Sequence, residues 1–495
     1  MSQQSNIRDA APVAIVGHRS LILAACVMAT FMAAVENTIV ATAMPSIVAD
    51  LGEFGLFSWV FAAYLLAQAV SVPIYGRLAD LYGRKRVFFA GAGLFLVGST
   101  LCGFAHGMLA LVAFRIVQGL GAGAVQPVAY TIVSDIYTPT ERARVQGLLS
   151  GTFGVAALVG PSLGAFLVDH GSWPIVFWVN LPIGAAAFAM LALFYREPVV
   201  RRLRRVDWLG ALLLMVGGAL VLLPMVQAAR LTGGVIAACL VVGGALLAVL
   251  ARHERRTAEP ILPLGLWRNR VVALANCGSF AMGAVIMGVS AFLPTYVEAV
   301  MGGGVAAAGT VLAAQPVGWA IAAFAAGRTM VRIGYRASLL AGASCMIIGS
   351  AFLTAMTPAS GPLWAGCGAF LVGTGMGFCN TTYLVAVQAA VARLERGAAT
   401  SSNLFMRTLG QATGAALFGA VVNAGVLRHA PDAGQTIERL LHPMLRAGLD
   451  PAAVAQVTDA MAGAIRIVYL MCAALGLVVM LLGARLPADL RPADR

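Results

Sequence analysis

The sequence predicts an all-α polytopic membrane protein with fourteen transmembrane helices arranged 6+2+6, as two pseudo-symmetric six-helix bundles around two inserted helices. Three observations lead to this prediction: apolar runs as long as a bilayer is thick, basic residues in alternate loops, and a repeat shared by the two halves of the chain. Hydrophobic residues make up 60% of the 495 residues and charged residues 11%, with a mean hydropathy of +0.87. A soluble core cannot use that much apolar surface.

The apolar runs define the individual spans. About 20 helical residues, each rising ~1.5 Å, cross the ~30 Å hydrocarbon layer. Runs of this length predict spans at 20–45, 55–75, 87–105, 107–133, 143–168, 174–195, 208–229, 231–251, 271–298, 305–327, 337–357, 361–389, 398–424 and 461–484. The polar N-terminal stretch lacks an apolar core followed by a cleavage site, so we expect the first span to stay uncleaved.

The net charge of +13 is distributed by topology. Basic residues collect in alternate loops, as at 77–86 and 201–205, whereas the opposite loops hold only Arg230, Arg428, Arg439 and Arg446. The positive-inside rule then places both termini in the cytoplasm. We expect a multi-pass protein of the cell (inner or plasma) membrane that is monomeric, surrounded by lipid, and binds no nucleic acid. The eight cysteines show no metal-ligand spacing, so no metal or cofactor is expected.

Several features of the first half recur in the second. The loop after span 2 reads GRLADLYGRKR and the loop after span 10 reads GRTMVRIGYR, each with two glycines seven residues apart. Span 4 carries RIVQGLGAGAVQ and span 12 carries AFLVGTGMGFCN. At an offset of 254 residues, Gly119, Gly121, Gly123, Glu141 and Arg142 correspond to Gly373, Gly375, Gly377, Glu395 and Arg396.

An offset of eight spans between halves of six leaves two spans inserted at the centre. This predicts a cytoplasmic tail at 1–19, a six-helix bundle at 20–200, two inserted helices at 201–260, a second bundle at 261–485 with an external loop at 425–460, and a tail at 486–495. The loop segment IERLLHPMLRAGL is amphipathic and is either an outer cap or a passive linker. Duplicated halves around a central site are the plan of secondary transporters.

The same motifs carry a family resemblance. GRLADLYGRKR resembles the loop 2–3 signature of the major facilitator superfamily, and RIVQGLGAG resembles its fourth-span signature. Four residues of span 5 resemble the antiporter signature of its drug exporters: Gly147, Gly160, Pro161 and Gly164. VENTIVATAMP, WPIVFWVNLPIG, VDWLG and ERGAATSSNLFMRTLG are similar to the fourteen-span drug:proton antiporter family. That family usually has Asp where this chain has Glu36, and many members have Gln at Glu298.

Glu36 and Arg115 are the candidates for proton coupling. Glu36 lies about two-thirds of the way across span 1, amid apolar residues. Arg115, Gln118 and Gln126 share one face of span 4, and an arginine facing lipid is expensive. The second-half copy has Ala369 at the arginine position, which indicates a functional rather than an architectural residue. Burial favours a protonated carboxyl group and a nearby arginine favours the ionised one, so such a site can bind and release a proton. Structural hydrogen bonding is the alternative for both residues.

A conformational latch is predicted in the loop after span 2. Its charges can pair across helices and its glycines permit a tight turn. The alternative is a static loop that only sets topology. The latch residues are Gly76, Asp80, Gly83, Arg84, Asp135 and Arg142. In span 5, the glycines and the kink at Pro161 favour a tight seam that closes the cytoplasmic side, although a generic packing seam would need the same residues.

Polar and aromatic groups inside the spans are candidates for substrate binding. With methionines and aromatics such as Met282 and Tyr296 they could line a large apolar cavity for bulky amphipathic compounds. Each singly can equally make an interhelical hydrogen bond. The substrate-binding candidates are Asn37, Tyr64, Gln68, Gln118, Gln126, Gln315, Trp319, Asn380, Tyr383, Asn403 and Met406. Arg407 also lies deep in span 13, without an assigned role.

Together these features predict a transporter and not an enzyme. An ATP-driven pump needs a Gly-Lys phosphate loop, but the single lysine, Lys85, follows Arg84. The resemblance implies a secondary active transporter that exports hydrophobic or amphipathic, cationic drugs or toxic compounds in exchange for protons by alternating access. Its partners would be a small-molecule substrate and protons. The alternatives are a lipid or glycolipid translocator of the same fold and a transport-inactive membrane sensor.

Overall fold

The structure is a computed structural model that describes residues 18–53, 56–197, 207–227, 231–257, 264–303, 305–429 and 451–487. Within these ranges every regular element is helical. The long helices are α1 (Arg19–Leu51), α2 (Phe57–Tyr82), α3 (Arg84–Gly103), α4 (Met108–Ile136), α5 (Pro139–Asp169), α7 (Asn180–Phe194), α8 (Trp208–Gln227), α9 (Gly233–Glu254), α10 (Arg270–Thr295), α11 (Val305–Thr354), α12 (Gly361–Ala389), α13 (Arg396–His429) and α15 (Pro451–Ala484). The short segments are α6 (Pro174–Trp178), η2 (Leu264–Arg268), η3 (Tyr296–Val300), η4 (Pro358–Ser360) and η5 (Arg393–Glu395).

The described helices contain the fourteen predicted spans. Thirteen helical stretches are long and apolar enough to cross a membrane. One of them, Ala307–Thr354, has 48 residues, about twice the ~20 that a bilayer requires. It lies in α11, whose backbone breaks at Gly334, where φ is +82°. Glycine adopts this left-handed conformation far more readily than other residues. The spans predicted at 305–327 and 337–357 therefore share one element, and the prediction of fourteen spans is confirmed.

Helix ends differ from the predicted spans where a local signal sets them. Helix α5 begins at Pro139 rather than 143, because Thr138 and Glu141 form a capping box in which each side chain accepts from the other's backbone N–H. Helix α15 begins at Pro451 rather than 461. The amphipathic part of the external loop lies in residues 430–450, outside the described residues.

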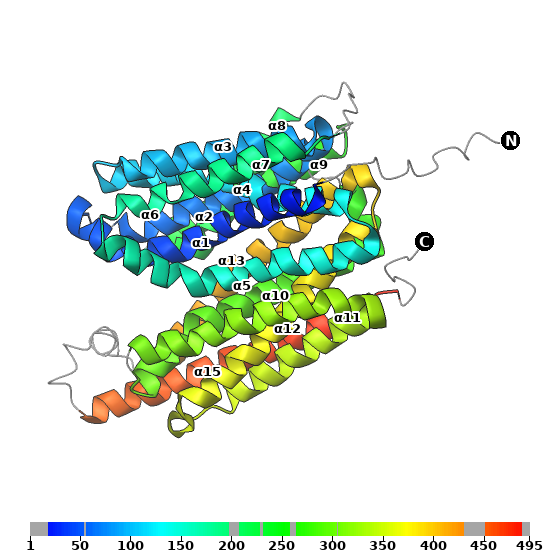
Figure 1. Ribbon diagram of the computed structural model, residues 1–495. Helices are drawn as coiled ribbons and strands as arrows, with labels where there is room; N and C mark the ends of the chain where they lie inside the picture. Colours follow the sequence, from blue (N-terminus) through cyan, green and yellow to red (C-terminus); the bar gives the residue numbers. More distant parts are fainter. Residues whose placement is uncertain are drawn as a thin grey trace.

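Figure 1 shows two groups of helices lying side by side, with α1, α3, α4 and α6 in one group and α10, α11, α12 and α15 in the other. The groups meet where α5 packs against α11 and α12, and where α2 and α4 pack against α13. The inserted helices α8 and α9 pack against each other, and α8 also contacts α2 and α13. This is the predicted 6+2+6 arrangement. The exact boundaries at residues 200 and 260 stay a prediction, because 198–206 and 258–263 lie outside the described residues.

The sequence repeat is also a repeat of packing. In α4, Gly119 faces the backbone of α2 and Gly121 faces that of α3. In α12, Gly373 faces the first span of α11 and Gly375 faces the second. A Cβ atom at any of the four positions would collide with an atom of the facing helix. The glycines are therefore required by close helix contacts that the two halves share.

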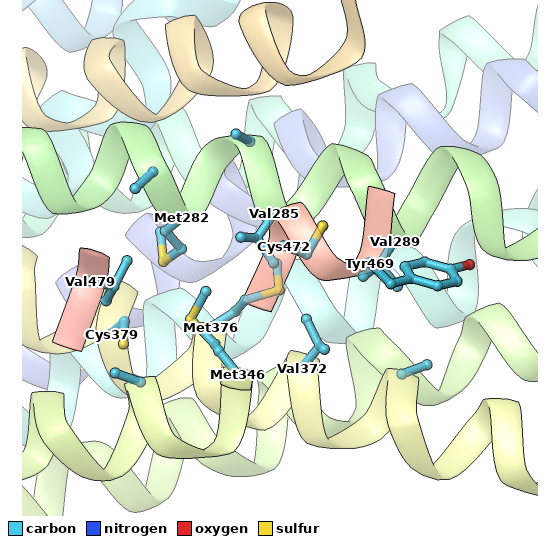
Figure 2. Close-up of a cluster of buried hydrophobic side chains, with 14 of the residues drawn as sticks. Met282, Val285, Val289, Met346, Val372, Met376, Cys379, Tyr469, Cys472 and Val479 are labelled. Atoms are coloured by element: carbon cyan, nitrogen blue, oxygen red, sulfur yellow. The ribbon is translucent and has the colours of Figure 1, made fainter. Parts of the chain in front are cut away.

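The core of the second group combines alanines and valines with six buried methionines. Figure 2 shows Met282 beside Met346, Met376 and Cys472, and all four are fully buried. Methionine adapts its shape to fill gaps between helices. Met282, expected to line a substrate cavity, belongs to this core instead. So does Tyr296, whose hydroxyl donates to a backbone carbonyl oxygen at 3.1 Å.

The packing makes a prediction for two glycines of α12. Gly373→Ala should destabilise the protein by about 1–3 kcal/mol, because the added methyl collides with the backbone oxygen of Gln315. Gly366→Ala on the same helix is the matched control, since a Cβ there meets no atom within 4 Å. Thermal unfolding of the purified variants in detergent measures the difference. Equal melting temperatures for the two variants would contradict the close contact.

Candidate functional site

A buried ion pair joins α1 to α4. Arg115 Nη1 lies 2.5 Å from Glu36 Oε1, and both side chains are fully buried. The Arg115 Nε donates to the backbone oxygen of Val60 in α2 at 3.1 Å. The guanidinium carbon also lies 4.1 Å from the centre of the Tyr64 ring, a cation–π contact. The two charges that the sequence indicated as partners are therefore in direct contact.

Three polar side chains complete the surroundings of the pair. Asn180 on α7 donates to the second oxygen of Glu36 at 2.6 Å. Gln118 accepts from Arg115 Nη1 at 2.8 Å. Ser99 on α3 accepts from Asn180 at 3.0 Å and from Gln118 at 3.1 Å. The carboxylate thus has a donor on each oxygen, which offsets much of its desolvation.

The contacts of this network lie on helices α1, α2, α3, α4 and α7 and on the short α6, where the Phe177 carbonyl oxygen accepts from Ser99 at 2.8 Å. Tyr64 and Gln118, expected to bind substrate, face Arg115 and are fully buried. Asn180 and Ser99 were not among the sequence candidates. Asn180 could have been found, because it lies within the motif WPIVFWVNLPIG. Ser99 carried no signal, since an isolated serine in an apolar helix is common.

A second cluster joins the two groups of helices at the end that carries residues 80–86 and 393–398, here called the basic end. Asp80 on α2 accepts from the backbone N–H of Gly397 at 3.1 Å and of Ala398 at 2.8 Å, in the first turn of α13. It also pairs with Arg84 at 3.1 Å. A carboxylate at a helix N-terminus is stabilised by free N–H groups and the helix dipole. Asp80 therefore connects the loop after span 2 to the opposite half.

Asp135 collects arginines from both halves. Its carboxylate lies 3.1 Å from Arg84 Nε, 3.2 Å from Arg396 Nη1 and 3.6 Å from Arg393 Nε. Arg142, the arginine predicted to join this cluster, makes no ion pair with Asp135 within the described residues. Its counterpart in the repeat, Arg396, takes that place instead, because the start of α13 lies against the end of α4.

Of the two latch glycines, Gly76 permits a close contact between helices and Gly83 forms a turn. A Cβ on Gly76 would collide with Ser401 on α13. Gly83 has φ +94°, in the left-handed region that favours glycine. After this turn, Glu197 accepts from the backbone N–H of Arg84 at 2.7 Å and of Lys85 at 3.0 Å. Glu197 was not predicted as part of the loop, because it is distant in sequence.

The glycines of α5 face two different neighbours. Gly147 and Gly154 face the backbone of α11 in the other half, where a Cβ would collide with a carbonyl oxygen at each position. Gly160 and Gly164 instead face α1 in the same half. Pro161 lies inside α5 at the change between these neighbours. Only part of the predicted motif therefore forms the seam between the halves.

The halves are in contact along one stretch of α5 and apart along the next. The face that touches α11 through Gly147, Gly151 and Gly154 continues, at spacings of four residues, to Leu158 and Ser162. Leu158 is 49% exposed and Ser162 is also exposed. The bundle is thus closed at the basic end, and along this face it opens toward the opposite end.

Several substrate candidates meet at the junction of the halves. Ser150 on α5 accepts from Asn380 of α12 at 2.9 Å and from Trp319 of α11 at 3.3 Å. Arg407 on α13 donates to Asn380 at 2.7 Å. Gln126 on α4 is buried beside Tyr130, which lies near Arg407. Ser150 and Arg407 were not assigned to the site from the sequence, although both face it.

The remaining candidates lie elsewhere. Asn403 bonds to Asn276 and Ser279 of α10, and Tyr383 packs in the core of the second half. Gln315 accepts from Ser290 at 3.1 Å. The structure does not bring these three to the junction. Gln68 and Met406 are half-buried. The side chain of Asn37 lies outside what the structure describes. Within the described ranges, no three His, Cys, Asp or Glu residues are grouped to hold a metal ion.

Two helical bundles that share a repeat and are joined at one end define a membrane transport protein built from two halves. The chain belongs to the major facilitator superfamily: the family description Major Facilitator Superfamily matches residues 26–415. It is 36% identical over 400 residues to Multidrug resistance protein 3 of Bacillus subtilis (strain 168), covering 79% of this chain and 77% of that one. Multidrug transporter protein MdtP of the same organism is 32% identical over 413 residues, with coverages of 82% and 76%.

Solved structures show the same fold. The human organic anion transporter MFSD10 (TETRAN) matches with a TM-score of 0.61 at 14% identity, over 92% of this chain and 100% of that one. The proton:xylose symporter XylE matches with a TM-score of 0.62 at 13% identity, over 93% and 94%. These similarities confirm the major facilitator fold that the sequence motifs predicted.

The clusters at the basic end lead to a prediction about conformation. Asp80→Asn should weaken the contact with α13, because a neutral amide bonds less strongly to Arg84 and to the helix N-terminus. Spin labels at the exposed positions Arg86 and Leu394 should then report a larger population of long distances. Glu53→Gln, an exposed change at the opposite end, is the control and should leave the distances unchanged. Unchanged distances in Asp80→Asn would show that the loop does not hold the halves together.

Proposed function

We propose that this protein is a secondary active transporter that exports hydrophobic and amphipathic compounds from the cytoplasm in exchange for protons, by alternating access. Support comes from relatives named as multidrug transporters and from a structure closed at one end only. The basic end would be cytoplasmic by the positive-inside rule. The described conformation would then be open to the outside.

The observation that carries proton exchange is the Glu36–Arg115 pair. Glu36 is fully buried within α1, and its carboxylate is held by Arg115 and Asn180. A proton arriving at Glu36 would remove its charge and break the pair, leaving Arg115 buried and uncompensated. Such a change strongly disfavours the existing packing of α1 against α4 and α7. Protonation would thereby be linked to a rearrangement of the first half.

The latch supplies the second moving part of this proposal. Asp80 and Asp135 join the halves at the basic end through ion pairs and backbone hydrogen bonds. For the cytoplasmic side to open, these contacts must break, and α5 must separate from α11 along its glycine face. The junction of the halves would then face the cytoplasm and bind substrate from that side.

The charge of the substrate is a separate question. The resemblance to drug:proton antiporters implied cationic compounds. In this conformation Glu36 is paired with Arg115 inside the first half, so its carboxylate is not available to a substrate. The proposal therefore covers hydrophobic and amphipathic compounds and proton exchange. It does not include a cationic substrate group bound by Glu36.

Proteoliposomes test the proposal directly. With an imposed proton gradient, the wild type should move a hydrophobic dye, and adding dye should release protons. Glu36→Gln should bind dye but lose dye-driven proton release, because the amide cannot carry a proton. Glu53→Gln is an exposed carboxylate-to-amide control and should behave as the wild type. Normal coupled transport by Glu36→Gln would overturn the assignment, and an absence of dye movement by the wild type would overturn export.

A further inference from the structure

A second arginine lies inside the bundle without a carboxylate partner. Arg407 on α13 is 8% exposed. Its Nη1 donates to Asn380 at 2.7 Å, whereas its Nε has no hydrogen-bond acceptor. Among the residues that the structure describes, the ion pairs involve other arginines. A buried guanidinium without an anion is costly, and ionisable residues kept inside a membrane usually serve function.

Two further polar side chains, Tyr130 and Gln126, are buried near Arg407. The Tyr130 hydroxyl on α4 is fully buried, and the Gln126 amide nitrogen on the same helix belongs to a side chain that is 8% exposed. Neither atom makes a hydrogen bond to a third group within the described residues, but the two side chains are close enough to hydrogen-bond to each other. The Tyr130 hydroxyl also lies near Arg407. Arg407 Nε thus lacks an acceptor, and the Tyr130 and Gln126 groups near it have no partner other than each other.

The chemistry of this place favours an anion. Guanidinium and amide N–H groups need acceptor atoms, and a tyrosine hydroxyl can donate as well. A carboxylate or sulfonate offers only acceptors and matches the Nε edge of arginine with two parallel hydrogen bonds. A cationic group would be repelled by Arg407. An anion therefore supplies the acceptor that Arg407 Nε lacks, and the Tyr130 and Gln126 donors lie near enough to add to its binding.

The surroundings also suit an apolar body attached to the anion. The Arg407 guanidinium lies 6.0 Å from the centre of the Phe153 ring on α5. Trp319 of α11 reaches the same junction through its bond to Ser150. Aromatic faces provide large apolar contact area beside a polar handle. The junction thus combines a positive charge with flat hydrophobic surfaces.

We infer that Arg407, with Tyr130 and Gln126, binds the anionic group of an amphipathic organic acid at the junction of the two halves. This inference rests on the proposed transport function and names a substrate class for it. Arg407 comes from the second half, and Tyr130 and Gln126 come from the first. The strength of anion binding therefore depends on how the halves are placed relative to each other.

Equilibrium binding to the purified full-length protein tests the inference. The probes are dansyl-aminoundecanoic acid and its methyl ester, which differ in charge but hardly in size. The wild type should bind the acid about tenfold more tightly than the ester, the usual scale of a charge-assisted pair. Arg407→Gln should weaken acid binding about tenfold and change ester binding less than twofold. Arg407→Lys should retain part of the preference, because it keeps the charge but loses the two-bond edge.

Two controls separate the site from general effects. Arg428→Gln removes an exposed arginine from the same helix and should leave both affinities unchanged. Tyr130→Phe keeps the ring and removes one donor, so acid binding should weaken about threefold with ester binding unchanged. If Arg407→Gln fails to fold, as judged by size-exclusion and thermal melting, Arg407→Lys and Tyr130→Phe decide the question.

Some results would overturn the inference. These are equal binding of acid and ester by the wild type, no measurable binding of the acid, or a preference for the acid that survives Arg407→Gln. Because binding is measured without a gradient, it is independent of proton coupling. If acid preference holds while proton-driven dye export fails, the anion site stands and the proposed function falls. If proton-driven dye export holds while the acid preference is absent, the anion site falls and the proposed function stands.

Discussion

The ion pair between Glu36 and Arg115 constrains the whole first half of the protein. Neither charge is tolerable alone in a hydrocarbon surrounding, so each must stay beside the other or be neutralised. The pair and its hydrogen bonds connect α1 to α4 directly, α7 through Asn180, α3 through Ser99 and α2 through the Val60 carbonyl. Five helices thus form one electrostatic unit. Movement is thereby directed to the borders of that unit, where α2, α4 and α5 meet the second half.

At those borders the contacts are of a different kind. Asp80 and Asp135 hold the halves together at the basic end, where their side chains are 1% and 3% exposed but Arg396 and Arg393 of the second half are 18% and 43% exposed. A pair with one partner in contact with water is weaker and easier to exchange than a pair buried on both sides. The α5–α11 seam relies on glycine backbone contacts and on the hydrogen bond from Trp319 to Ser150, so few polar side chains need a new partner on separation. The fold therefore places strong pairing within a half and exchangeable contacts between halves.

The sequence was sufficient for the spans, the repeat and the choice of Glu36 and Arg115 as coupling candidates, because each depends on local patterns or on the cost of charge in lipid, but it did not establish that the two side chains are in contact. It was insufficient wherever two helices distant in sequence had to be placed side by side. Asn180 and Ser99 look like ordinary polar residues until α7 and α3 are set against α1. Arg396 rather than Arg142 reaches Asp135, because that choice depends on where α13 begins relative to α4. Met282 lies on the core face of α10, which its apolar sequence does not distinguish from a cavity face.

Arg115 and Arg407 show how one side chain can have opposite roles within the same bundle. Arg115 is neutralised by a carboxylate of its own half and stabilises that half in all states in which Glu36 is ionised. Arg407 has an amide partner and an open Nε edge at the junction of the halves. Closing the halves around Arg407 is easier when an anion accompanies it, because a lone buried charge is penalised. A proton on Glu36 has the reverse effect on Arg115, since it removes the counterion. A proton would thus remove the counterion of one buried arginine, whereas an anionic cargo would supply a counterion to the other. Opposite effects of this kind are what the exchange of a proton for the cargo requires.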